Sequence, residues 1–182
     1  MGTELVNVAG KPRSLDSIGP VKKIGVLSDT HASSLDQLPI SFVKIIKSMD
    51  LVIHAGDYTS RRFVEELLAT GIPFCGVYGN VDPPSVRETL RPEELLSLGS
   101  FKVGVTHPSE GGPPWESEKL ARSKFPGVDV VVYGHTHAAS NEFKEGVLSL
   151  NPGSAVGKYP ARYASMAVLS MHPEPRATIQ KA

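Results

Sequence analysis

The sequence contains one cysteine, no excess of charge of either sign and no long apolar run. Its single cysteine, Cys75, excludes a disulfide within the chain and is compatible with a reducing compartment such as the cytoplasm. Nineteen Lys and Arg residues balance nineteen Asp and Glu residues, so the formal net charge is zero. Binding to long nucleic acids or to membrane surfaces relies on a basic excess, so we expect neither as a partner.

Uninterrupted apolar runs reach four residues, as in Val130–Tyr133. A membrane-spanning helix needs about 20 apolar residues, and a signal peptide needs roughly 7–15 near its start. The 182 residues, 40% of them hydrophobic and 21% charged, fit one folded domain. We therefore predict a soluble cytoplasmic protein with a single domain over residues 21–182. Residues 1–20 are expected to be a flexible extension, with a strand at Leu5–Val8 as the alternative.

The first half of the chain alternates between predicted strands and predicted helices. Short apolar segments predict strands at Lys23–Ser28, Leu51–His54 and Ile72–Val77. Amphipathic segments between them predict helices at Pro39–Met49 and Ser60–Thr70. This order favours parallel strands joined by right-handed crossovers.

The second half is richer in strands. Gly99–Ser100 and Lys144–Gly146 each separate two apolar segments, which is typical of hairpins. A short helix is expected at Glu116–Lys124, and single strands are expected at Val128–Tyr133, Ser165–Ser170 and Ala177–Gln180.

Side chains that bind metal ions follow the predicted strands. They lie in five blocks: Ser28-Asp29-Thr30-His31, His54-Ala55-Gly56-Asp57, Gly79-Asn80-Val81-Asp82, Val105-Thr106-His107 and Gly134-His135-Thr136-His137. Ligand sites of α/β sheets gather beyond the carboxyl ends of the strands, so we expect the five blocks to converge. In an extended loop, residues i and i+2 point to the same side, so Asp29 and His31 can bind one ion. Carboxylate, imidazole and amide ligands without thiolates suit Mn²⁺, Fe²⁺ or Zn²⁺.

Together these blocks resemble the motifs of the calcineurin-like metallophosphoesterase superfamily, and most of all its small bacterial and archaeal phosphodiesterase branch. The resemblance covers about residues 22–172, including the block Asn151-Pro152-Gly153-Ser154. It implies an α/β fold, namely a four-layer α/β/β/α sandwich of two mixed sheets with a dinuclear site at one edge. It also implies a phosphodiesterase that attacks a small phosphate ester with a metal-bridging hydroxide, and it permits a homodimer or homotetramer.

The resemblance also implies the ligands of two divalent ions, Mn²⁺ first, with Ni²⁺, Fe²⁺, Zn²⁺ and Mg²⁺ as alternatives. One ion would be held by Asp29, His31, Asp57 and His137, and the other by Asp57, Asn80, His107 and His135. Asp57 would bridge the two ions, and Asn80 would also bind the substrate phosphate.

Two departures from the family pattern affect the expected chemistry. Many relatives have Gly-Asn-His-Glu where this chain has Gly79-Asn80-Val81-Asp82, so the histidine that can protonate the leaving group is missing. Asp82 is the candidate replacement acid, provided that its pKa is raised. The candidate catalytic residues are therefore Asp57, Asn80 and Asp82. In addition, Pro108 follows His107 where close relatives have Gly-His, so the loop up to Trp115 is rebuilt.

Other interpretations remain open at this point. The fold also serves as a protein-binding scaffold in a retromer subunit that has lost part of the ligand set, whereas the set is complete here. A phosphomonoesterase or a nuclease of short oligonucleotides is a further alternative. His54 is either an ordinary buried histidine or a residue that orients Asp57. Lys158, Tyr159 and Arg162 are candidates for the mouth of the site.

Overall fold

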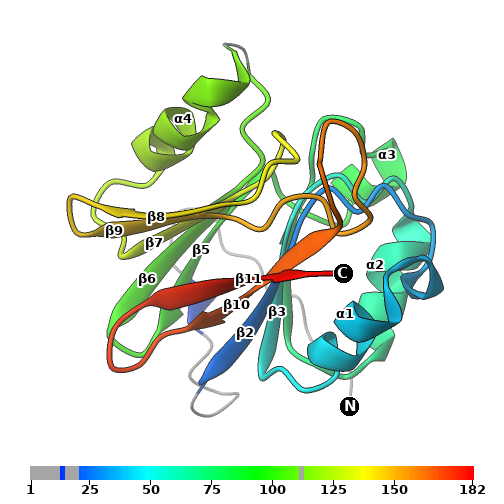
Figure 1. The fold of residues 1–182 in the computed structure, drawn as a ribbon, viewed down its shortest axis with the longest axis horizontal. Coiled ribbons are helices and arrows are strands. Elements are labelled where there is room, and N and C mark those ends of the chain that lie inside the picture. Colours follow the sequence, from blue (N-terminus) through cyan, green and yellow to red (C-terminus); the bar gives the residue numbers. More distant parts are fainter. Residues whose placement is uncertain (1–12, 15–20, 111–112) are drawn as a thin grey trace.

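The structure, a computed structural model, describes residues 13–14, 21–110 and 113–182. Two β-sheets pack face to face, and helices cover their outer faces (Figure 1). This arrangement confirms the predicted α/β fold, a four-layer α/β/β/α sandwich of two mixed sheets. Within the described ranges, no helix is both long enough and apolar enough to cross a membrane.

The first sheet contains β2 (Lys23–Leu27), β3 (Leu51–Ala55), β4 (Phe74–Val77), β10 (Ser165–Ser170) and β11 (Arg176–Lys181). The strand order is β11-β10-β2-β3-β4. Helices α1 (Ile40–Ile46) and α2 (Arg61–Ala69) connect β2, β3 and β4, which are parallel as predicted. Strand β10 is antiparallel to β2, and β11 is antiparallel to β10, which makes this sheet mixed.

The second sheet contains β1 (Arg13–Ser14), β5 (Glu93–Leu98), β6 (Phe101–Thr106), β7 (Val130–Tyr133), β8 (Ser140–Lys144) and β9 (Val147–Asn151). The strand order is β1-β5-β6-β7-β9-β8. The pairs β5–β6 and β8–β9 are the two predicted hairpins. Strands β6, β7 and β9 run parallel, and α4 (Ser117–Lys124) packs against β7.

Alternate residues of each strand enter different layers of the core, as the two-residue period of a strand requires. In β3, Ile53 packs between the two sheets, whereas Val52 packs under the helices of the first sheet. In β7, Val132 packs between the sheets, whereas Val131 and Tyr133 pack under α4. Strands that are buried on both faces read as continuous apolar runs, which explains the short unbroken stretches of the sequence.

Among the described residues, three short helical elements were not predicted. They are the helix α3 (Pro84–Arg87) and the 3₁₀-helices η2 (Leu35–Gln37) and η3 (Pro114–Glu116). The sequence signal for α3 is the pair Pro83-Pro84, which reads as a turn but here supplies the first positions of a helix.

The predicted extension over residues 1–20 is described only at residues 13–14. These two form β1 and pair with Leu96 and Ser97 of β5, so they belong to the second sheet. The remainder of the extension, including the alternative strand at Leu5–Val8, lies outside the described residues.

The topology brings the predicted ligand loops to one edge of the sandwich. Strands β2, β3 and β4 end at this edge, and so do β6 and β7, because each set is parallel. All five blocks singled out in the sequence lie at or directly after the carboxyl ends of these five strands. The candidate site therefore lies at this edge, between the two sheets.

Candidate metal centre

The loops that carry the candidate ligands have an unusual backbone. Seven described residues other than glycine have positive φ angles, and five of them are candidate ligands: Asp29, His31, Asp57, His135 and His137. This left-handed conformation costs about 1–2 kcal/mol per residue for an L-amino acid. The expectation of extended loops was therefore wrong. In these loops, residues with a left-handed backbone alternate with other residues, and this alternation brings neighbouring candidate ligands together. Strain of this kind persists where surrounding contacts hold it, and it points to function.

Main-chain hydrogen bonds hold the first two loops beside one another. The N–H of Asp29 donates to the carbonyl of Gly56 at 2.9 Å, and the N–H of His31 donates to the carbonyl of Asp57 at 3.0 Å. The N–H of His135 donates to Asp29 Oδ2 at 3.1 Å, which ties the loop after β7 to the loop after β2. The ligand positions are thus fixed by the chain itself.

A first cluster consists of Asp29, His31, Asp57 and His137. One ligand atom of each lies within 4.8 Å of those of the other three. His137 Nε2 lies 3.2 Å from Asp29 Oδ1 and 3.2 Å from His31 Nε2. The two carboxylates are buried, and the two imidazoles are half-buried.

The chemistry of this cluster fits a divalent cation. Asp29 Oδ1 is buried and makes no hydrogen bond to any residue that the structure describes, which is costly for an ionised oxygen. His137 Nδ1 donates to the carbonyls of Lys158 and Tyr159, both at 3.0 Å, so in its neutral form the ring turns an unprotonated Nε2 toward the cluster. Without a cation, the hydrogen bond with Asp29 raises the pKa of His137. Two imidazole lone pairs and two carboxylates that converge on one point are satisfied together by a metal ion.

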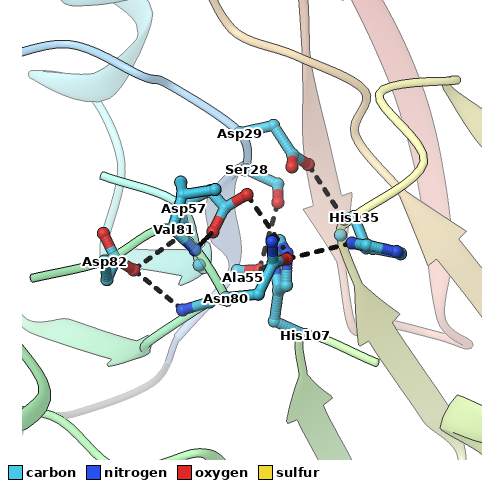
Figure 2. A network of polar contacts seen from close by, with 12 residues as sticks. Ser28, Asp29, Ala55, Asp57, Asn80, Val81, Asp82, His107 and His135 are labelled. Carbon is cyan, nitrogen blue, oxygen red and sulfur yellow. Dashed lines mark hydrogen bonds and ion pairs between the residues drawn. The ribbon is translucent and has the colours of Figure 1, made fainter. Parts of the chain in front are cut away.

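A second group of contacts surrounds Asn80. Its Oδ1 lies 3.2 Å from His107 Nε2 and 3.1 Å from His135 Nδ1 (Figure 2). Asp57 joins this group to the first cluster, because its Oδ2 lies 3.4 Å from His107 Nε2 and 3.7 Å from His31 Nε2. The structure therefore brings together all seven side chains that the sequence singled out as metal ligands.

His107 is a strongly perturbed base of the site. Its Nδ1 donates to the carbonyl of Ala55 at 2.6 Å, which directs Nε2 toward Asp57 and Asn80. Burial lowers the pKa of His107, but contact with Asp57 and the charge of Asp29 outweigh burial and raise the pKa to about 9. In turn, burial raises the pKa of Asp57, but His107 and the N–H of Val81 outweigh it and bring the pKa below its usual value.

Metal binding at this site should release protons. At pH 7.5 His107 of the metal-free protein is protonated, since its pKa is about 9, and a metal ion has to displace that proton. We expect titration calorimetry in buffers of different ionisation enthalpy to detect release of about one proton from this group. Apparent affinity should rise about tenfold per pH unit as the pH approaches 9 and then level off. Equal heats in all buffers at pH 7.5 would contradict this.

Asp82 does not have the surroundings of a leaving-group acid. Its Oδ1 accepts hydrogen bonds from the N–H groups of Tyr58 at 2.7 Å and Thr59 at 2.8 Å. Its Oδ2 accepts from the N–H groups of Asp57 at 3.0 Å and Gly79 at 2.8 Å. Burial raises the pKa of Asp82 even though these donors lower it, as an acid would require. Both oxygens are nevertheless occupied by the main chain, so the geometry makes Asp82 an organiser of two ligand loops (Figure 2).

His54 acts on the main chain around Asp57. Its Nδ1 accepts a hydrogen bond from the N–H of Gly56 at 3.2 Å, so its protonated Nε2 faces Thr30 Oγ1 at 3.1 Å. The hydroxyl of Thr30 donates in turn to the carbonyl of Asp57 at 3.4 Å. Burial lowers the pKa of His54 well below its usual value, which keeps the ring neutral. Of the two earlier interpretations, the geometry favours orientation of Asp57, through its backbone.

Gly79 is required for the close approach of two loops. A Cβ atom at this position would lie 2.1 Å from Asp57 Oδ1 and 2.7 Å from the nitrogen of Asp57. Real Cβ atoms essentially never make such short contacts, and the neighbouring atoms belong to a candidate ligand. We expect Gly79→Ala to weaken metal binding by about 10-fold or more. Gly99→Ala should leave metal binding unchanged, because no atom of the described residues lies within 4 Å there and its φ of +63° strains only a hairpin turn. Equal metal affinity in both variants would refute this role.

The block at residues 151–154 connects the ligand loops, a role that its sequence alone did not reveal. Ser154 Oγ donates to the carbonyl of Asp29 at 2.7 Å and accepts from the N–H of Lys158 at 2.9 Å. Asn151 Nδ2 donates to the carbonyl of Gly134 at 3.2 Å. Lys158 and Tyr159 thus reach the site through their carbonyls, which bind His137, and their side chains are exposed.

The remaining candidate for the mouth of the site is Arg162, and the loop after His107 ends at Trp115. Arg162 is exposed, and no contact joins its side chain to a ligand among the described residues. Trp115 is 82% exposed at the end of the loop that follows His107. Residues 111–112 of that loop lie outside the described part of the chain.

Comparison with known proteins gives a consistent result. A model of the calcineurin-like phosphoesterase superfamily domain matches residues 23–174, which include all five motif blocks. A probable metallophosphoesterase of Methanothermobacter thermautotrophicus is 36% identical over 133 residues, or 72% of this chain and 76% of that protein. A phosphodiesterase of Methanocaldococcus jannaschii is 31% identical over 151 residues, or 74% of this chain and 85% of that protein.

Among solved structures, vacuolar protein sorting 29 of Cryptosporidium parvum is similar with a TM-score of 0.71. The match covers 89% of this chain and 98% of that chain, at 20% sequence identity. At this identity the similarity concerns the fold alone.

Proposed function

The chain belongs to the calcineurin-like phosphoesterase superfamily, and from this premise we propose that it is a metal-dependent phosphodiesterase with a dinuclear centre. The observation that carries the proposal is the position of Asp57. Its Oδ2 lies 3.7 Å from His31 Nε2 and 3.4 Å from His107 Nε2, between the two groups of ligands. A carboxylate in that position suits a bridge between two cations.

The residues divide into two ligand sets. Asp29, His31, Asp57 and His137 would hold one ion, and Asp57, Asn80, His107 and His135 would hold the other. When bound, two divalent ions, Mn²⁺ first among them, activate water toward phosphorus and neutralise charge that develops on the phosphoryl oxygens. The position of Asn80 Oδ1 between two imidazoles supports its role as a neutral ligand. A neutral ligand keeps the loaded site positive enough to attract an anionic phosphate.

Asn80 is also proposed to bind the substrate. Because its Oδ1 faces His107 and His135, its Nδ2 group remains to donate a hydrogen bond to a phosphate oxygen. The amide is held on a turn that other residues fix, so the donor needs little reorganisation. The substrate is a small phosphate diester, in keeping with the absence of a basic excess in the sequence.

The motif supplies no acid for the leaving group. Val81 occupies the position of the histidine found in many relatives, and the oxygens of Asp82 are bonded to the main chain. Departure of the leaving group then depends on its own stability as an anion. We therefore propose a preference for diesters with aryl or otherwise activated leaving groups over those with simple alkoxides.

The test compares two chromogenic esters. Metal-stripped protein is assayed on bis(p-nitrophenyl) phosphate and p-nitrophenyl phosphate, with Mn²⁺, Ni²⁺, Zn²⁺, Mg²⁺ or no metal added back. We expect Mn²⁺ to restore hydrolysis of the diester in preference to the monoester. Preference for the monoester would indicate a phosphomonoesterase instead. Absence of turnover on either ester, with two ions bound, would overturn the enzymatic proposal and favour the scaffold.

A further inference from the structure

We propose that Arg87 is a positioning residue that holds the Asn80 turn in the conformation needed to bind the second metal ion. The sequence did not single out this residue, since it lies outside every motif block. The inference rests on the proposed dinuclear site, and its test is chosen to be independent of hydrolysis.

Arg87 donates hydrogen bonds to three carbonyls of the turn that carries Asn80. Its Nη2 lies 2.7 Å from the carbonyl oxygen of Asn80 and 3.4 Å from that of Gly79, and its Nε lies 2.8 Å from that of Asp82. The guanidinium also lies 5.2 Å from the centre of the Tyr78 ring, a cation–π arrangement. One side chain thus contacts the turn from end to end.

Two side chains of opposite charge hold the turn, one through an N–H group and the other through carbonyl groups. The carboxylate of Asp82 accepts the N–H of Gly79, and the guanidinium of Arg87 binds the carbonyls of Gly79 and Asn80. Hydrogen bonds with one ionised partner are about twice as strong as neutral ones. The two residues together leave the main chain of the turn little freedom to rotate the Asn80 side chain away.

A short helix places Arg87 for this task. Helix α3 begins at Pro84, and its Val86 is completely buried against the core under α2. The N–H of Arg87 donates to the carbonyl of Pro83 at 3.2 Å. Because burial of Val86 fixes the position of the helix, it also fixes the direction from which the Arg87 guanidinium reaches the turn. A planar guanidinium offers several donors in a fixed geometry, which the single ammonium of lysine does not reproduce.

The effect of Arg87 is expected to be confined to one ion. Asn80 Oδ1 lies 3.2 Å from His107 and 3.1 Å from His135, so a shift of the turn moves a ligand of the second ion directly. The Asp29 loop is held by Gly56 and Ser154, and His137 is held by the carbonyls of Lys158 and Tyr159. None of these contacts involves Arg87. The first ion is linked to the turn through Asp57, whose Oδ1 accepts the N–H of Val81 at 3.1 Å, but the N–H of Asp57 is held separately by Asp82. The first ion should therefore be retained.

The experiment measures Mn²⁺ binding at equilibrium by calorimetry and by electron paramagnetic resonance, which distinguishes a coupled pair of ions from a single one. The variants are Arg87→Gln and Arg87→Lys, with Asn80→Ala as the reference that removes the ligand itself. Arg62→Gln is the matched control, because Arg62 is an exposed arginine paired with Glu66 on α2. Thermal unfolding of each metal-free protein is recorded in parallel.

We expect Arg87→Gln to weaken binding of one ion by about 10- to 100-fold and to leave the other within about twofold. The coupled signal should disappear at low Mn²⁺, as in Asn80→Ala, and return at high Mn²⁺. Arg87→Lys should recover part of the loss, and Arg62→Gln should behave as wild type.

Several outcomes would overturn the inference. Equal weakening of both ions, together with a lower Tm of the metal-free protein, would make Arg87 an ordinary structural residue. Unchanged binding, or a wild-type protein that holds one ion only, would overturn it as well. A wild-type protein that binds two ions and hydrolyses nothing defeats the proposed phosphodiesterase but leaves this test intact.

Discussion

Asp57→Asn should lower kcat/KM for bis(p-nitrophenyl) phosphate by at least about 10³-fold. The physical reason lies in Oδ2, which faces His31 on one side and His107 on the other. A neutral amide can present one oxygen to one cation but cannot share a negative charge between two. We expect the variant to bind one Mn²⁺ in place of two, as measured by calorimetry on metal-stripped protein.

The matched control is Asp50→Asn, at the other end of β3. The carboxylate of Asp50 accepts hydrogen bonds from the N–H groups of Lys22 and Lys23, far along the strand from the ligand loops. The same chemical change there should leave turnover within about twofold of wild type. Retention of wild-type turnover in Asp57→Asn, with both ions bound, would reject the bridging role.

Asp82→Asn should destabilise the protein and reduce turnover on all leaving groups to the same extent. Whichever way the amide is turned, its NH₂ group faces two main-chain N–H donors, either those of Tyr58 and Thr59 or those of Asp57 and Gly79. Loss of an acceptor for two buried donors costs about 1–3 kcal/mol each. We expect Tm to fall by roughly 10 °C for a domain of this size.

The kinetic measurement separates an organising role of Asp82 from an acidic one. Diesters that differ only in the pKa of the leaving group are hydrolysed by wild type and by Asp82→Asn, and log kcat/KM is plotted against that pKa. If Asp82 organises the Asp57 and Asn80 loops, the line shifts downward with its slope unchanged. A selective loss of turnover on poor leaving groups, with a steeper slope, would show that Asp82 acts as the acid that protonates the leaving group.

The composition of the candidate site could be predicted from the sequence because the candidate ligands follow strands. Asp29, His31 and Asp57 come directly after two short apolar segments, and the carboxyl ends of parallel strands share an edge. Local spacing was therefore sufficient to gather the ligand set. Local spacing did not predict the backbone conformation of the loops, because no sequence pattern marks positive φ angles at residues such as Asp57 and His135.

The role of Asp82 shows where local reasoning failed. In sequence it stands two positions after Asn80, one residue beyond the acid of many relatives, and burial raises its pKa as an acidic role requires. Its partners Asp57, Tyr58 and Thr59 come from a loop more than twenty residues earlier. Which polar group a buried carboxylate meets depends on how two loops pack, and no spacing rule contains that information.

By itself, the sequence determined the candidate ligand residues, the order of the longer strands and helices, and the two hairpins, because these depend on residue type and on periods of two or about four residues. The tertiary structure alone decided that Asp57 lies between two ligand groups, that Asp82 serves the main chain, and that Arg87 of α3 binds the Asn80 turn. These are contacts between segments distant in sequence or between a side chain and a carbonyl. They arise when two sheets pack and their loops meet, since burial then obliges each polar group to find a partner.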